Sequence, residues 1–302
     1  MTIYLNGCSH MHADKCPPST KASFGYIVAS SILGIGNYVD ILYTYWLRKK
    51  YDAHRNSISD SYKDIFFDKM EPDKNYVLNH SQCGKSNDKI FYETITTLYE
   101  SIKLNKRIDL YIIQWSGPNR RLHTLPSDET KRTESVEINP HDFSELGIKI
   151  EPFASNQTLH YMLILQDLFD KYNIEYVFVP YMELDSNSLK MSNIKSMLNS
   201  SKLTCDVEVG HRNEIRKKGY SIDYPGHPNQ IGHYYLASKI LDVLNIGNNL
   251  VGFFEFYNSI ISDFNLNNFV TYHDSITNMK KYYNELGDGE DNLLKRIFKK
   301  TV

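Results

Sequence analysis

The alternation of short apolar runs with helical patterns is the feature that most constrains the fold of this chain. Runs rich in β-branched and aromatic residues predict strands at residues 3–5, 76–78, 108–114 and 176–179. Helical patterns follow these runs at residues 19–34, 86–104, 156–172 and 229–244. Ser19 or Thr20 is the expected cap of the first helix, and Ser86 or Asn87 that of the second. Such alternation predicts right-handed crossovers and an α/β fold with an open parallel sheet covered by helices on both faces.

Three segments do not fit this alternation. Residues 35–74 form an insertion between the first predicted helix and the second strand. Residues 120–152 are polar, and we expect a long irregular loop over the active face there. Residues 247–302 follow the last predicted helix and contain two helical patterns. The expected organisation is therefore a domain of residues 1–246 with a C-terminal helical extension of residues 247–302.

Charge and cysteine content limit the classes of function. The formal net charge is −2 over 302 residues, so we expect no nucleic-acid partner and no attraction to an anionic membrane. The most apolar stretch is broken by Asn37, Asp40 and glycines, so no transmembrane segment is expected, and no signal peptide is seen. Four scattered cysteines predict neither a disulfide framework nor a zinc ribbon. A cytoplasmic or virion-associated setting is expected.

Four short blocks carry the residues suited to chemistry. Three of them follow predicted strands and the fourth precedes the last helix: Gly7-Cys8-Ser9-His10, Cys83-Gly84-Lys85-Ser86, Gly117-Pro118-Asn119-Arg120 and Asp223-Tyr224-Pro225-Gly226-His227. Parallel sheets bind ligands at the carboxyl ends of their strands, where these blocks are expected to meet. A serine at such a turn can act as a nucleophile, and a histidine can accept its proton. Backbone N–H groups and an Asn side chain can stabilise an oxyanion.

In this order the four blocks resemble those of the SGNH (GDSL-like) hydrolase superfamily, which includes viral and phage members. The resemblance implies a three-layer, flavodoxin-like α/β fold. It also implies that Ser9 is the nucleophile and His227 its base, with the N–H groups of Ser9 and Gly84 and the Asn119 side chain as oxyanion donors. The implied reaction is ester hydrolysis through an acyl-enzyme, without metal or organic cofactor. A small acyl group on a small molecule or a glycan is the expected substrate, as in an O-deacetylase.

The chain departs from the family pattern at three places. Cys8 stands where the family has Asp before the nucleophile, and Tyr224 stands where the triad acid is usual. Asp223, one residue further back, orients His227 if the loop bulges there; otherwise a backbone carbonyl does so and the site is a Ser-His dyad. Arg120 and Arg121 follow Asn119, where the family often has Asp, and they either bind an acidic group of the substrate or pair with acids of the loop. Trp115 is a further candidate for substrate contact.

Other readings of the sequence remain open. The chain can be an SGNH-fold binding or structural protein with little activity, for example in a virion, and its extension is then a candidate contact for another copy or a virion partner. His10, His12 and Asp14 are an alternative metal site beside the nucleophile. A flavodoxin-like binding domain is the third reading, although no Gly-rich phosphate fingerprint follows the first strand.

Overall fold

A computed structural model describes most of the predicted domain. It covers residues 1–8, 11, 23–42, 67, 70–81, 85–118, 121–126, 133–138, 151–184, 189–218, 220–221 and 227–246. The description is of the backbone alone at residues 42, 121–126, 133–138, 151–153, 189–192 and 230. The predicted extension, residues 247–302, lies outside the described residues.

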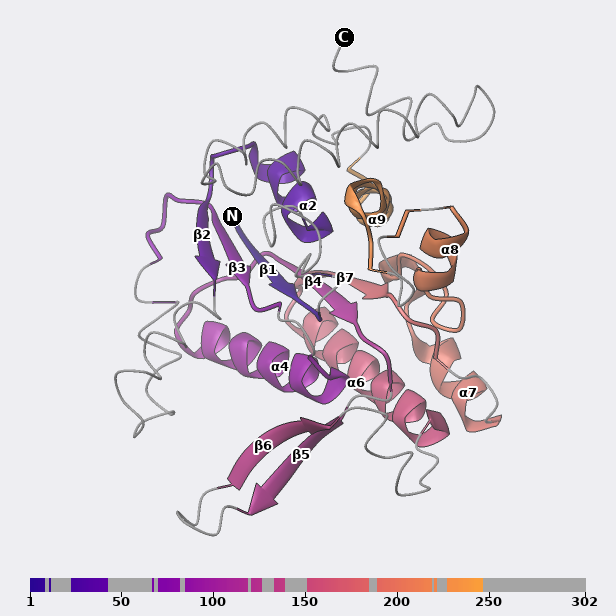
Figure 1. Ribbon diagram of the computed structural model, residues 1–302. Helices are drawn as coiled ribbons and strands as arrows, with labels where there is room; N and C mark the ends of the chain where they lie inside the picture. The colour runs from indigo at the N-terminus through magenta and orange to yellow at the C-terminus, as the bar shows by residue number, and fades with distance from the viewer. Residues whose placement is uncertain are drawn as a thin grey trace, which may run out of the picture.

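A five-stranded parallel sheet forms the centre of the molecule (Figure 1). Its strand order is β2 (Val39–Leu42), β3 (Tyr76–Asn79), β1 (Thr2–Asn6), β4 (Leu110–Trp115) and β7 (Glu175–Pro180). In the central strand, Ile3 is in register with Val77 on one side and Leu110 on the other. The predicted α/β fold with a parallel sheet is confirmed.

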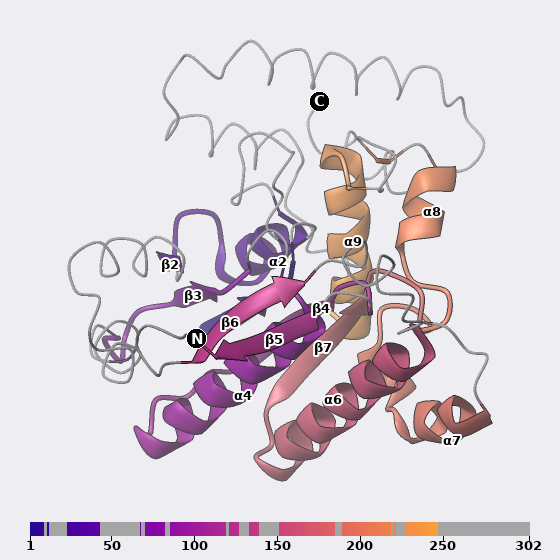
Figure 2. The same ribbon diagram turned by 60° about the horizontal axis from the view of Figure 1, so that its bottom comes forward.

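Helices pack against each face of the sheet because successive strand side chains point to opposite faces. Ile3, Leu5, Ile112 and Val177 face α2 (Phe24–Leu33) and α9 (Gln230–Val243). Tyr4, Leu78, Tyr111 and Phe178 face α4 (Asn87–Lys103) and α6 (Glu151–Lys171). Figure 2 shows α4 and α6 side by side along their face, and the Phe91 and Tyr161 rings stack between them at 4.3 Å. Burial on both faces explains why the strands read as continuous apolar runs.

Two segments outside the predicted alternation contain strands. The insertion supplies β2, which pairs with β3 at the edge of the sheet. The predicted irregular loop is wrong over part of its length: β5 (Arg121–Pro126) and β6 (Thr133–Ile138) form an antiparallel pair, and β5 lies against α4 (Figure 1). α6 then begins at Glu151, inside the segment predicted as loop. Polar side chains do not prevent backbone pairing between strands, so a polar segment without apolar alternation can still form a β-hairpin.

The remaining helices are short or begin elsewhere than predicted. α7 (Leu189–Met197), the 3₁₀ turn η3 (Ser200–Lys202) and α8 (Arg212–Lys217) follow β7. The N-cap of α2 is Ser23, whose hydroxyl accepts the Tyr26 N–H at 3.4 Å, whereas the predicted caps, Ser19 and Thr20, lie outside the described residues. Ser86 caps α4. In the described part of the chain, no helix combines the length and the apolar character that crossing a membrane requires.

Candidate active site

The structure describes the neighbours of most predicted site residues. Ser9, Gly84, Asn119, Arg120 and Asp223 lie outside the described residues. Arg121 begins β5, where only the backbone is described. The site is therefore built from Cys8, Lys85, Ser116 and His227, which adjoin or belong to the four blocks.

The carboxyl ends of β1 and β4 form a topological switch point. The two strands are adjacent, and the chain after β1 leads to α2 on one face, whereas the next helix after β4 is α6 on the other. Chains that leave neighbouring strands toward opposite faces open a crevice at the strand ends, where ligands of parallel sheets bind. Ser9 follows one of these strands and Asn119 the other.

Gln114 joins the end of β1 to the end of β4. The Cys8 N–H donates to Gln114 Oε1 at 3.1 Å, and the Cys8 thiol donates to the same oxygen at 3.3 Å. Gln114 Nε2 donates to the Trp115 carbonyl at 2.6 Å, which holds the amide in this orientation. Cys8 is completely buried, so it anchors the backbone immediately before Ser9.

Asn87 joins the first turn of α4 to the segment after β4. Its Oδ1 accepts the Ser116 N–H at 2.7 Å, and its Nδ2 donates to the Ser116 carbonyl at 3.0 Å. The same Nδ2 donates to Thr158 Oγ1 of α6 at 3.0 Å. One side chain thus satisfies both backbone groups of Ser116, as a neighbouring strand would, and holds the start of the segment that leads to Asn119.

Lys85 joins the end of β3 to the end of β1. Its ammonium donates to Asn6 Oδ1 at 2.8 Å, to Glu93 Oε2 at 2.5 Å and to the His80 carbonyl. The Lys85 side chain is 0% exposed and that of Glu93 is 9% exposed. Asn6 Nδ2 in turn donates to the Tyr4 hydroxyl, the Ile90 carbonyl and Thr94 Oγ1 at 3.0–3.1 Å. The amide of Asn6 thereby links Lys85 to α4.

The buried ion pair affects the two rings beside it. Burial, and secondly the charge of Lys85, holds the pKa of His80 well below its ordinary value. Burial, and secondly the charge of Glu93, raises the pKa of Tyr4 well above its ordinary value. His80 is therefore neutral and Tyr4 protonated near pH 7, and the ion pair carries the charge of this region.

The segment containing His227 is fixed at the start of α9. His227 is half-buried, and Pro228 forms an isolated antiparallel bridge with Ser221. The Asn229 N–H donates to the Tyr220 carbonyl at 2.8 Å, and its side chain caps α9 by accepting the Gly232 N–H at 2.9 Å. His233 Nδ1 accepts the Phe24 N–H at 3.3 Å, which ties the start of α9 to the start of α2.

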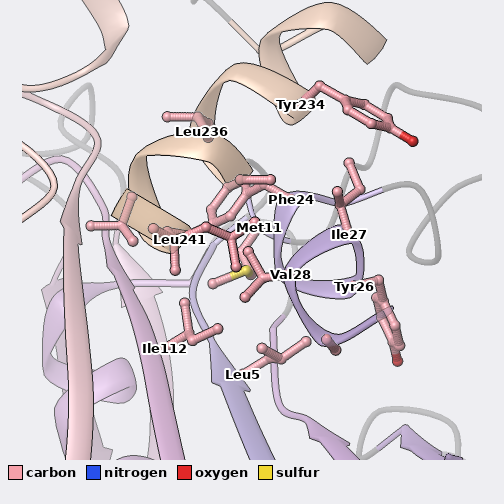
Figure 3. Close-up of a cluster of buried hydrophobic side chains, with 14 of the residues drawn as sticks. Leu5, Met11, Phe24, Tyr26, Ile27, Val28, Ile112, Tyr234, Leu236 and Leu241 are labelled. Carbon is pink, nitrogen blue, oxygen red and sulfur yellow. The ribbon is translucent and has the colours of Figure 1, made fainter. Parts of the chain in front are cut away.

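Met11 anchors the chain on the other side of Ser9. Its N–H donates to the Cys8 carbonyl at 3.1 Å, and its side chain is completely buried. Figure 3 shows Met11 among Leu5 of the sheet, Phe24 and Val28 of α2, and Leu241 of α9. The predicted nucleophile therefore lies, in sequence, between two buried and hydrogen-bonded residues.

Trp115 has a packing role. Only 2% of it is exposed, and its ring meets Phe178 edge-on at 5.9 Å in the cluster under α4 and α6. This burial leaves the ring no surface for the predicted substrate contact. Trp115 lies two residues after Ile113 and four after Tyr111 in β4, so its side chain points to the same face of the sheet as theirs.

Three residues that build this site were not predicted as site residues from the sequence, although Asn87 was a candidate helix cap. Gln114, Lys85 and Asn87 all lie in or beside the predicted blocks, and a polar residue at the end of an apolar strand is the available signal for Gln114. Their partners are 106, 79 and 29 residues away along the chain, so periodicity does not reveal them.

Neither the alternative metal site nor comparison with known proteins assigns a function to these residues. His10, His12 and Asp14 lie outside the described residues, and within the described ones no three His, Cys, Asp or Glu side chains gather in a manner suited to a metal ion. No protein-family model and no curated protein matches this sequence.

Proposed function

We propose that the protein is a serine esterase of the SGNH type, with the three-layer arrangement of that superfamily. One observation carries the proposal: three buried clamps, Cys8–Gln114, Lys85–Asn6 and Asn87–Ser116, join the chain segments next to Ser9, Gly84 and Asn119. An oxyanion hole requires donors from separate segments held in one geometry before the substrate arrives. A set of clamps between those segments meets this requirement.

The proposed reaction is a two-step acyl transfer. Ser9 Oγ attacks the ester carbonyl while His227 takes the hydroxyl proton and then returns it to the departing alkoxide. The N–H groups of Ser9 and Gly84 and the Asn119 side chain stabilise the negative charge on the carbonyl oxygen. Water, deprotonated by His227, then attacks the acyl-enzyme and releases the acid and free Ser9.

The group that orients His227 is either Asp223 or a backbone carbonyl. His227 is half-buried, and the bridge between Pro228 and Ser221 holds the backbone next to it whichever group orients the ring. Comparison of Asp223→Asn with His227→Ala decides between them, because loss of a triad acid lowers kcat about 10⁴-fold and a dyad is insensitive to this change.

The proposed substrate is an ester of a small acyl group, carried by a small molecule or a glycan. Such an acyl group needs little volume beside Ser9, so specificity rests on the alcohol portion. Arg120 and Arg121 are proposed to bind an acidic group on that portion, for which a planar guanidinium is well suited.

Hydrolysis of p-nitrophenyl acetate and labelling by a fluorophosphonate test the proposal. We expect the wild type to turn over the ester and to be labelled, and Ser9→Ala to lose about 10⁴-fold or more of kcat together with all labelling. Ser31→Ala is the matched control, since Ser31 lies on α2 and donates to the Ile27 carbonyl at 2.8 Å. It should keep wild-type turnover and labelling.

Absence of both turnover and labelling in a folded wild type would refute the proposal. That result would favour the alternative of an SGNH-fold binding or structural protein, and the next experiment would then be a search for partners of residues 247–302.

A further inference from the structure

We propose that Lys85 is a positioning residue for the proposed hydrolysis: through its buried ammonium it holds the described residues on either side of the segment that contains Gly84 against the strand that leads to Ser9. The inference rests on the proposed function, since it assigns a role within that reaction. It concerns a side chain that touches neither the ester nor the reacting atoms.

The ammonium of Lys85 donates to acceptors on three separate segments. Its three N–H groups meet Asn6 Oδ1 on β1, Glu93 Oε2 on α4 and the carbonyl of His80. His80 comes directly after β3, and Lys85 follows it five residues later. The ammonium therefore joins the end of β3 and the end of β1 at one atom.

The charge of Lys85 is not explained by stability alone. Well-packed apolar side chains of similar volume often replace a buried ion pair with no loss of stability. A fully buried ammonium, in contrast, restricts where its neighbours can lie, because each of its N–H groups needs an acceptor at a defined distance and direction. Lys85 precedes the N-cap Ser86 and follows Gly84, so this directional constraint acts at the backbone of the proposed oxyanion donor.

Loss of Lys85 should weaken the stabilisation of the transition state more than the binding of the substrate. A displacement of about 1 Å in a catalytic group can lower the rate about a hundredfold. The oxyanion donors act mainly on charge that develops during attack, so loss of this positioning lowers kcat and leaves KM nearly unchanged. A side chain that served folding alone would produce no such kcat effect in a variant that is fully folded.

The experiment separates these two roles with paired substitutions. Lys85→Met leaves Glu93 buried without its cation, and we expect a marked fall in the melting temperature. Lys85→Met/Glu93→Leu removes both charges and should recover most of the lost melting temperature. In this double variant we expect kcat for p-nitrophenyl acetate to fall about tenfold to a hundredfold, with KM within about twofold of wild type. Rates are divided by the fraction of protein that a fluorophosphonate labels at completion.

Lys74→Met is the matched control. Lys74 pairs with Glu71 at the opposite end of β3, and both side chains are more than half exposed, at 51% and 62%. This variant should retain wild-type kcat.

Two outcomes overturn the inference in distinguishable ways. An active wild type whose folded double variant keeps wild-type kcat would refute the role of Lys85 and leave the proposed function in place. A wild type with neither turnover nor labelling would refute the proposed function, and the role of Lys85 with it.

Discussion

Gly7 and Gly117 follow neighbouring strands of the sheet and face different surroundings. A Cβ on Gly7 would lie 2.8 Å from Gln114 Oε1 and 2.8 Å from Met11 Cβ. A Cβ on Gly117 would lie 2.8 Å from Met182 Sδ. The Gln114 amide is held by hydrogen bonds and Met11 Cβ by its backbone, whereas the thioether end of half-buried Met182 can rotate away.

Gly7→Ala should therefore destabilise the protein more than Gly117→Ala. We expect Gly7→Ala to lower the free energy of unfolding by about 1–3 kcal/mol, because the added methyl group displaces the Cys8–Gln114 clamp. Gly117→Ala should cost less than about 1 kcal/mol, since a flexible side chain accommodates the new atom. Urea denaturation of both variants measures the difference. Equal losses would show that Met182 is held as firmly as the Gln114 amide.

The start of α9 lies against the backbone of the preceding segment. Gly232 lacks the side chain that would collide there: a Cβ would lie 2.5 Å from the Tyr220 carbonyl oxygen and 3.0 Å from Pro228 Cβ. Tyr220 is itself held by a hydrogen bond from its N–H to the Ile215 carbonyl of α8. The close approach of helix and backbone therefore sets where the segment with His227 lies relative to α9.

Gly232→Ala should reduce both stability and activity. Neither backbone can give way easily, so we expect a loss of about 1–3 kcal/mol in the free energy of unfolding despite the better helix propensity of alanine. A shift of α9 away from Tyr220 also moves the chain on either side of His227, and kcat should fall. Ser238→Ala on the same helix is the control and should change stability by less than about 0.5 kcal/mol. A Gly232→Ala variant with wild-type stability would show that Tyr220 moves freely.

At the scale of the whole molecule, the buried histidines His80 and His211 make stability depend on pH. His211 lies after β7, where its Nε2 meets Thr204 Oγ1 at 2.8 Å. Burial lowers its pKa to about 4, with Glu214 opposing the shift and Lys239 adding to it. The pKa of His80, after β3, is also lowered, first by burial. Both rings stay neutral in the folded state at pH values where the unfolded chain binds protons.

Stability should therefore fall as the pH is lowered from 6.5 toward 4. In this window the unfolded state binds a proton at His211 that the folded state does not. Each pH unit therefore lowers the free energy of unfolding by about 1.4 kcal/mol. Between pH 7 and pH 5, we expect the free energy of unfolding of His211→Gln to fall by about 2 kcal/mol less than that of the wild type. Urea denaturation at the two pH values tests this, and a residual slope from His80 should persist in the variant. An identical pH dependence in both proteins would show that His211 is protonated in the folded state.

The sequence by itself determined four of the five strands of the central sheet and most of the helices that cover it. Burial of alternate strand residues and of one side of each helix is a local periodicity, and it is visible in apolar runs such as residues 110–113. The start of α2, the strand β2 and the β5–β6 pair were missed, because caps outside the apolar pattern and pairing at sheet edges have weak local signals.

Only the tertiary structure decided which polar residues hold the candidate site together. The partners Cys8 and Gln114, Asn6 and Lys85, and Asn87 and Ser116 lie far apart along the chain. They meet because parallel strands bring their carboxyl ends to one edge, where backbone groups that leave the sheet need new hydrogen-bond partners. A single sequence records the residue types able to satisfy those groups. The fold determines which of them pair, because hydrogen bonds require distances and directions that exist only after the strands are aligned.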